Sequence, residues 1–175
     1  MLRRLHLNRM VLGIALAATL LYPDTALRAD DSYAVGTATA HNGKPLILRG
    51  LSQLPQSPAD ADFPHLVSLY WGYTSSNGMP PPDANAAQVR FEDDLMTLDR
   101  PDLGRLVLVV TGNNLKAWHV QVRDVDVWLD NFEKLSSVRS GCPIEIETGF
   151  DPDWSLLKDF LDSMKAAPQN PALKT

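Results

Sequence analysis

The chain has 175 residues, of which 45% are hydrophobic, so it is long enough for one domain with a substantial core and too short to expect two. Its formal net charge of −5 and the lack of a basic stripe make it a poor binder of phosphate backbones, and we expect no nucleic-acid partner. The four histidines lack metal-ligand spacing and the sequence has no glycine-rich phosphate loop, so we expect no metal and no cofactor.

Residues 1–29 differ from the rest of the chain. Three arginines and no acidic residue precede the apolar run Val11 to Tyr22, which is short beside the roughly 20 residues that a spanning helix needs. A basic start, a short apolar run and a small-residue segment are typical of a secretory signal. We therefore expect a signal peptide over residues 1–29 and a periplasmic or secreted protein without a membrane span after cleavage. The alternative is an inner-membrane anchor formed by an uncleaved signal.

Residues 30–165 are predicted to form a single domain. Asn42-Gly43 tolerates the positive φ angles of a tight turn and separates two strand-like runs, so a β-hairpin is expected near residues 33–50. Alternating residues then predict the strand "HLVSLYWGY". After a proline-rich break, Asp83 is predicted to cap a helix, because apolar residues follow it at spacings of three and four. The apolar stripe of that helix consists of Ala84, Ala87, Phe91, Leu95 and Leu98.

The second half of the domain repeats this alternation of strands and helices. Gly112-Asn113 predicts a hairpin that joins strands at Leu106–Thr111 and Leu115–Val122. Asp124 is expected to cap the next helix. The strand "CPIEIETGF" follows, and its Cys142 is interpreted as a small buried side chain rather than a reactive thiol, because no His or Lys adjoins it.

The stretch "GFDPDW" is interpreted as the start of a last helix. Asp151 can accept bonds from the free N–H groups, Pro152 suits the first helical position, and Asp153 adds favourable charge to the first turn. Trp154 is expected to pack over the sheet edge or a neighbouring helix. Residues 166–175 contain two prolines and no apolar stripe, and are predicted to be a mobile tail.

The order from Leu66 onward is β-α-β-β-α-β-α, which predicts an α+β fold: a ferredoxin-like sandwich with an added N-terminal β-hairpin. In that plan the helices cover one face of an antiparallel sheet and leave the other open. The run "LVLVV" (106–110) is apolar on both faces, so both need cover. We expect the N-terminal hairpin or a second subunit, as in a homodimer, to provide it.

Polar side chains are expected on the open face. One set of strand residues is expected to face the helices: Val67, Leu69, Trp71, Trp118, Val120, Ile144 and Ile146. If it does, the alternation of side chains along a strand places a set of polar residues on the opposite face. That set comprises Tyr70, His119, Gln121, Glu145 and Glu147. It could bind a polar or cationic ligand, or be an ordinary wet sheet face. Glu92-Asp93-Asp94 is interpreted as a solvated helix face, because consecutive helical residues point about 100° apart.

Three motifs occur in a recognisable order: "WGYTSSNGMP", "RFEDDLMTL", and "DPDW" after "PIEIET". From about Ser32 to Phe160 the chain resembles the bacterial family known as domain of unknown function 695. The matching positions are Trp71, Tyr73, Gly78, Met79, Pro80, Glu92, Asp93, Pro143, Asp151, Pro152 and Trp154. That family is similar in outline to the regulator of ribonuclease E activity, a ferredoxin-like protein that acts by binding, so the resemblance implies no catalytic residue. The hairpin "TGNNLKAWHVQV" departs from the family in lacking its Gly-Arg pair and Tyr.

These observations predict an exported protein of unknown biochemical function, a non-catalytic binding or interaction module in the cell envelope. Its partner would be an unknown protein or a small polar ligand. The alternative is a periplasmic enzyme with a site on the open sheet face around His119 and Glu145. A cytoplasmic regulator of a nuclease would require residues 1–29 to be something other than a signal.

Overall fold

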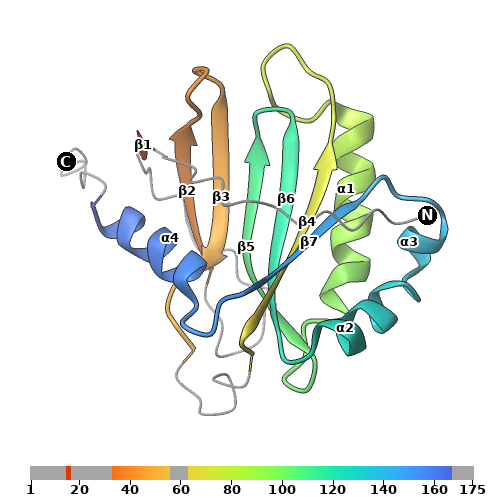
Figure 1. The fold of residues 1–175 in the computed structure, drawn as a ribbon. Coiled ribbons are helices and arrows are strands. Elements are labelled where there is room, and N and C mark those ends of the chain that lie inside the picture. The colour runs from red at the N-terminus through yellow and green to blue at the C-terminus, as the bar shows by residue number, and fades with distance from the viewer. Residues whose placement is uncertain (1–14, 17–32, 56–62, 167–175) are drawn as a thin grey trace, which may run out of the picture.

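The computed structural model describes residues 15–16, 33–55 and 63–166. In this part of the chain seven strands form one antiparallel sheet in the order β1-β2-β3-β5-β6-β4-β7 (Figure 1). The strands are β1 (Ala15–Leu16), β2 (Tyr33–Thr39), β3 (Pro45–Leu51), β4 (His65–Gly72), β5 (Gly104–Gly112), β6 (Leu115–Val122) and β7 (Glu145–Phe150). Apart from β1 and Ala166, the predicted signal peptide and tail lie outside the described residues, and both stay predictions.

Four helices accompany the sheet in the described residues: α1 (Pro82–Met96), α2 (Val125–Phe132), α3 (Ser136–Arg139) and α4 (Ser155–Ala166). The predicted α+β class is therefore confirmed. Asp124 caps α2 as predicted and accepts from the Val127 N–H at 3.0 Å. The predicted cap Asp83 is wrong: α1 begins at Pro82, whose fixed φ suits a first helical position, and Asp83 lies in the first turn. No helix in the described ranges is long and apolar enough to cross a membrane.

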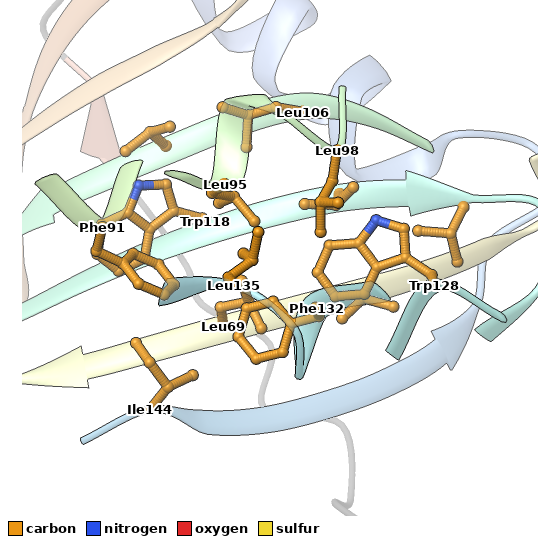
Figure 2. Close-up of a cluster of buried hydrophobic side chains, with 14 of the residues drawn as sticks. Leu69, Phe91, Leu95, Leu98, Leu106, Trp118, Trp128, Phe132, Leu135 and Ile144 are labelled. Atoms are coloured by element: carbon orange, nitrogen blue, oxygen red, sulfur yellow. The ribbon is translucent and has the colours of Figure 1, made fainter. Parts of the chain in front are cut away.

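The larger core lies between the sheet and α1, α2 and α3 (Figure 2). Phe91 of α1 is at its centre, with its ring 5.8 Å from Trp71, 4.8 Å from Trp118 and 6.1 Å from Phe132, measured between centroids. Trp128 stacks on Phe132 at 5.2 Å. Val67, Leu69, Trp71, Trp118, Val120 and Ile144 are buried in this cluster, and Ile146 packs against it, which confirms the predicted inward face of β4, β6 and β7.

A second core lies on the opposite face, between β2, β3, β5 and α4. Figure 1 shows α4 beside β2 and β3, away from the other three helices. The ring of Phe160 lies so close to β3 that a Cβ atom on Gly50 would be 2.6 Å from its Cε1. The prediction that one sheet face would be left open is therefore wrong where α4 packs, although the part over β4, β6 and β7 lies beyond this core.

Strand β5 explains how one sequence run serves both cores. Its pairing with β6 shifts register between Leu106 and Leu108, a β-bulge. Leu106 and Val109 consequently belong to the larger core, whereas Val107 and Leu108 belong to the second core. Both faces of β5 are covered as expected, but the N-terminal hairpin is not the cover, and the homodimer stays a prediction. Helix α4 covers the second face, while the N-terminal hairpin of β2 and β3 extends the sheet at its edge.

The start of α4 differs from its prediction in one respect. Asp151 is the expected acceptor: Oδ1 accepts from the Ser155 N–H at 2.7 Å and Oδ2 from the Leu156 N–H at 3.3 Å. The helix begins at Ser155, so Pro152 is not its first residue but part of a preceding turn. Trp154 has a φ of 56°, which interrupts the helical run and costs about 1 kcal/mol. Burial of its ring in the second core, on the order of 2–3 kcal/mol, offsets that strain.

Candidate functional site

Four polar side chains from three adjacent strands meet on the sheet face opposite α1. Ser68 of β4 is the register partner of both Glu147 of β7 and His119 of β6. The Ser68 Oγ and His119 Nδ1 atoms are 2.9 Å apart, and the Tyr70 hydroxyl donates to Glu147 Oε2 at 3.2 Å. The rings of Tyr70 and His119 meet edge to face at 6.2 Å. We call Ser68, Tyr70, His119 and Glu147 the polar face.

Burial sets the protonation states of the polar face. It lowers the pKa of His119 to about 4, so the imidazole is neutral at pH 7. It also raises the pKa of Tyr70, which the neighbouring Glu147 raises further, so the phenol keeps its proton and remains a donor. The Glu147 carboxylate is therefore the one formal charge among these four side chains, and it faces two neutral groups that can each donate and accept hydrogen bonds.

The structure brings together three of the five residues predicted for this face: Tyr70, His119 and Glu147. Glu145 lies opposite Tyr70 in the β4–β7 register and is exposed. Gln121 is buried, and its Nε2 donates to the backbone oxygen of Asp151 at 2.9 Å, so its amide attaches the start of α4 to the sheet. Ser68 was missed, although its place in the alternation of β4 points it to the same side as Tyr70.

A second group of charged side chains lies on the α1 face, where the solvated interpretation of Glu92 is wrong. Its carboxylate pairs with Arg49 of β3 and with Lys116 of β6, whose Nζ is 2.9 Å from Oε2. The Trp118 indole N–H also donates to Glu92 Oε2 at 2.8 Å. Only 14% of the Glu92 side chain is exposed, because α1 turns this residue toward the sheet beside Phe91.

The electrostatics of Glu92 follow from these partners. Burial by itself would raise the pKa of the Glu92 carboxyl, but Lys116 and Arg49 outweigh it and hold that pKa below its usual range. Asp94, also predicted to be solvated, accepts from the Ser137 N–H at 2.8 Å and so ties α1 to α3. Asp93 alone of the three is exposed as predicted.

A cavity of about 270 Å³ opens beside this ion-pair cluster. Its charged lining comes from Arg49, Glu92, Asp93 and Lys116, and its apolar walls come from Val35, Ile47, Val89 and Val109. We call this cavity the charged groove. Sequence patterns did not indicate it, because Arg49 and Glu92 are 43 positions apart and no local spacing relates them.

Several positions of the family motifs have structural roles. The Tyr73 hydroxyl donates to the Gly78 oxygen at 2.9 Å, and the Tyr73 N–H donates to the Asn114 oxygen at 3.0 Å. The Asn114 N–H in turn donates to the Gly78 oxygen at 2.9 Å. These bonds hold the loop after β4 against the β5–β6 turn. Such residues therefore shape the end of the sheet rather than a ligand site.

Cys142 has the environment of a packed side chain. It is half-buried, its Sγ donates to the Ser137 oxygen at 2.9 Å, and burial raises the pKa of its thiol. A raised pKa disfavours the nucleophilic thiolate. Within the described ranges, no group of three or more His, Cys, Asp or Glu residues is placed to hold a metal ion.

The antiparallel sheet with helices packed on both faces defines an α+β protein. The chain belongs to DUF695, a family of unknown function, whose model matches residues 37–162. The resemblance inferred from the three motifs is therefore confirmed. No curated protein and no solved structure matches the chain.

Proposed function

We propose that this protein is a non-catalytic binding module of the cell envelope, and that its polar face binds a small ligand with a positively charged or hydrogen-bond-donating group. The observation that carries the proposal is the contact among Ser68, Tyr70, His119 and Glu147 across three neighbouring strands. Paired strands of a sheet hold side chains in fixed positions, which lowers the entropy lost when a ligand binds.

The available atoms favour a cationic ligand. Glu147 accepts one bond from Tyr70, and a carboxylate has further lone pairs for a second donor. The neutral His119 adds an acceptor or donor without adding charge. An ammonium group would form a charge-assisted bond with Glu147, roughly twice as strong as a neutral one. A ligand with a hydroxyl in place of the ammonium should therefore bind more weakly.

Binding accounts for the site better than catalysis does. A Ser paired with a neutral His is the arrangement of a nucleophile and its base. Ser68, however, is 6% exposed, which leaves its oxygen little access to a substrate. The carboxylate that the enzyme alternative needs, Glu145, is exposed and lies opposite Tyr70 rather than His119.

The fold and the N-terminal sequence support two further parts of the proposal. The strand order β7-β4-β6-β5, with α1 and α2 between β4 and β7 in the chain, supports a ferredoxin-like plan for that segment. The basic start and short apolar run of residues 1–29 support export. Intact-mass analysis of cell fractions tests export: we expect a soluble envelope species that starts near Asp30. A full-length cytoplasmic species would overturn export and favour the nuclease-regulator alternative.

The ligand site is tested by NMR titration with 1,4-diaminobutane and with 1,4-butanediol as the uncharged analogue. We expect saturable shifts of amides in β4, β6 and β7 with the diamine, and weaker binding of the diol. Glu147→Gln should weaken diamine binding at least tenfold, because it removes the charge that the ammonium group meets. Glu133→Gln, at an exposed residue after α2, is the matched control and should bind like the wild type. Equal affinity in Glu147→Gln, or no saturable shift with the diamine, would overturn the polar face as the ligand site.

A further inference from the structure

The charged groove lies on the other side of the sheet from the polar face. Its charged residues come from three elements: Arg49 from β3, Glu92 and Asp93 from α1, and Lys116 from β6. Val109, which lines the groove, belongs to the larger core on the α1 face of the sheet. The neighbouring Leu108 belongs to the second core, on the face that carries the polar side chains. The groove is therefore a separate candidate site, and nothing about it depends on the proposal for the polar face.

The charged lining of the groove consists of two cations, Arg49 and Lys116, and two carboxylates, Glu92 and Asp93. Both cations pair with the carboxylate of Glu92, whereas Asp93 is exposed at the rim. The Lys116 side chain is only 9% exposed and lies 5.0 Å from the Trp118 ring centroid, so little water screens it. A guanidinium has five N–H donors and an ammonium three, so one carboxylate does not use the donors of both groups. A ligand carboxylate could accept hydrogen bonds from the donors that Glu92 leaves unused.

The walls of the groove indicate that such a ligand is partly apolar. Ile47 is 40% exposed and Val89 is 47% exposed, which makes them two of the few large hydrophobic side chains that face solvent in the described residues. Both line the groove, together with Val35 and Val109. The apolar surface thus lies directly beside the two cations, and contact with a short hydrocarbon chain would remove it from water.

The volume of the cavity and the charge at its rim limit which ligands can bind. A cavity of about 270 Å³ is slightly below the usual range for ligand pockets, which begins at about 300 Å³, so only a small ligand fits. Asp93 lines the rim and is exposed, so a second negative charge on the ligand would meet repulsion. We propose that the charged groove binds a small organic monocarboxylate, with its carboxylate between Arg49 and Lys116 and its hydrocarbon chain against Ile47 and Val89.

The probe for this site is hexanoate, with hexanol and hexylamine as matched neutral and cationic analogues and adipate as the dicarboxylate. Isothermal titration calorimetry on the whole protein should show saturable binding of hexanoate and at least tenfold weaker binding of the other three. NMR shifts should be confined to β3, the start of β6 and the middle of α1. Absence of saturable binding, or equal binding of hexanol and hexanoate, would overturn the proposal.

Two substitutions with opposite expected effects on hexanoate affinity distinguish a ligand-binding cluster from a purely structural ion pair. Lys116→Met should weaken hexanoate binding at least tenfold, because it removes one of the two cations. Glu92→Gln should strengthen binding several-fold, because it removes the carboxylate that competes with the ligand. If Glu92→Gln weakens binding as much as Lys116→Met does, the cluster is structural and the proposal fails. Lys158→Met, at an exposed position of α4, is the control for loss of a positive charge.

A third variant tests the groove without touching the ion pairs. Val89→Trp places a large ring at the groove mouth from an exposed helix position, and it should abolish hexanoate binding. Val127→Trp is its matched control, because Val127 is 52% exposed on α2 and lies outside the groove. Unchanged binding in Val89→Trp would overturn the assignment. Glu147→Gln on the polar face should leave hexanoate binding unchanged, so failure of this proposal and failure of the proposed function are distinguishable.

Discussion

The two faces of the sheet differ in how they are covered. In the described residues, three helices and four fully buried aromatic side chains cover the α1 face: Phe91, Trp118, Trp128 and Phe132. The opposite face has one helix of 12 residues, α4, over β2, β3 and β5, and polar side chains over β4, β6 and β7. The first face therefore supplies most of the apolar burial. The second face leaves polar side chains on strands of the sheet, where they can form hydrogen bonds with a ligand.

The largest expected effect tests whether the α1 face dominates stability. Phe91→Ala removes a ring that contacts Trp71, Trp118 and Phe132, and should lower the free energy of unfolding by about 3–5 kcal/mol. Phe160→Ala should cost less, because α4 can detach while the rest of the domain stays folded. Urea unfolding of both variants measures the difference. Equal losses would show that the two faces are equally important for stability.

The second prediction concerns acid sensitivity of the polar face. Burial lowers the pKa of His119 to about 4 in the folded protein, whereas an unperturbed imidazole, as in the unfolded chain, has a pKa of 6.5. The unfolded chain therefore takes up the proton first as pH falls. Stability should therefore be lost between pH 6.5 and pH 4, by up to about 3 kcal/mol. His119→Gln cannot take up this proton and should lose less stability over that window than the wild type. Urea unfolding of both proteins at pH 7, 5.5 and 4.5 measures these losses of stability.

The control for this prediction is His41→Gln, which changes an exposed histidine in the β2–β3 turn. Other groups near His119 also have to be considered, namely Tyr70 and Glu147, and they are unchanged in both variants. The difference between wild type and His119→Gln therefore isolates the imidazole. An identical pH dependence in the two proteins would contradict burial of a neutral His119.

Much of the fold could be predicted because its signals are local. Asp124 precedes an apolar stripe, and Gly112-Asn113 marks the β5–β6 turn, so both elements could be predicted from a short window. The structure places that turn one residue later, at Asn113-Asn114, because Gly112 ends β5 and pairs with Leu115. The side of the sheet that α4 covers was not readable, because an amphipathic helix shows one apolar stripe whichever face it packs on. A bulge also interrupts the alternation of β5. Gly50 was the available signal, since a glycine inside a strand often marks close approach of another element.

The two candidate sites also differ in how well their residues could be predicted from local sequence patterns. Strand alternation was sufficient to place Tyr70, His119 and Glu147 on one face, because a period of two fixes the side to which each residue points. The cluster of Arg49, Glu92 and Lys116 joins two strands and a helix that are far apart in sequence. Its geometry depends on how α1 lies across the sheet, which no local pattern specifies. Glu92 belonged to a family motif, but that alone did not reveal its partners.

A smaller effect is expected at the contact between β3 and α4. The Cβ atom of Gly50→Ala would lie 2.6 Å from Phe160 Cε1, so the ring has to shift, at a cost of about 1–3 kcal/mol. Adding Phe160→Leu should recover part of this loss, because the smaller side chain leaves room for the methyl group. A double-mutant cycle in urea measures the coupling. Gly72→Ala is the control, since no atom lies within 4 Å of its added Cβ, and strict additivity of the first pair would contradict close packing of α4.

The smallest expected effect concerns the attachment of α4 through its cap. Asp151→Ala removes the acceptor of the Ser155 and Leu156 N–H groups and should cost about 1–2 kcal/mol. Amide exchange should accelerate in the first turn of α4 and remain slow in β4 and β6. Asp153→Ala is the matched control: Asp153 is exposed in the same turn, and its replacement should change stability by less than about 0.5 kcal/mol. If both variants lost the same stability, the negative charge that both aspartates place near the helix start would matter rather than the Asp151 cap.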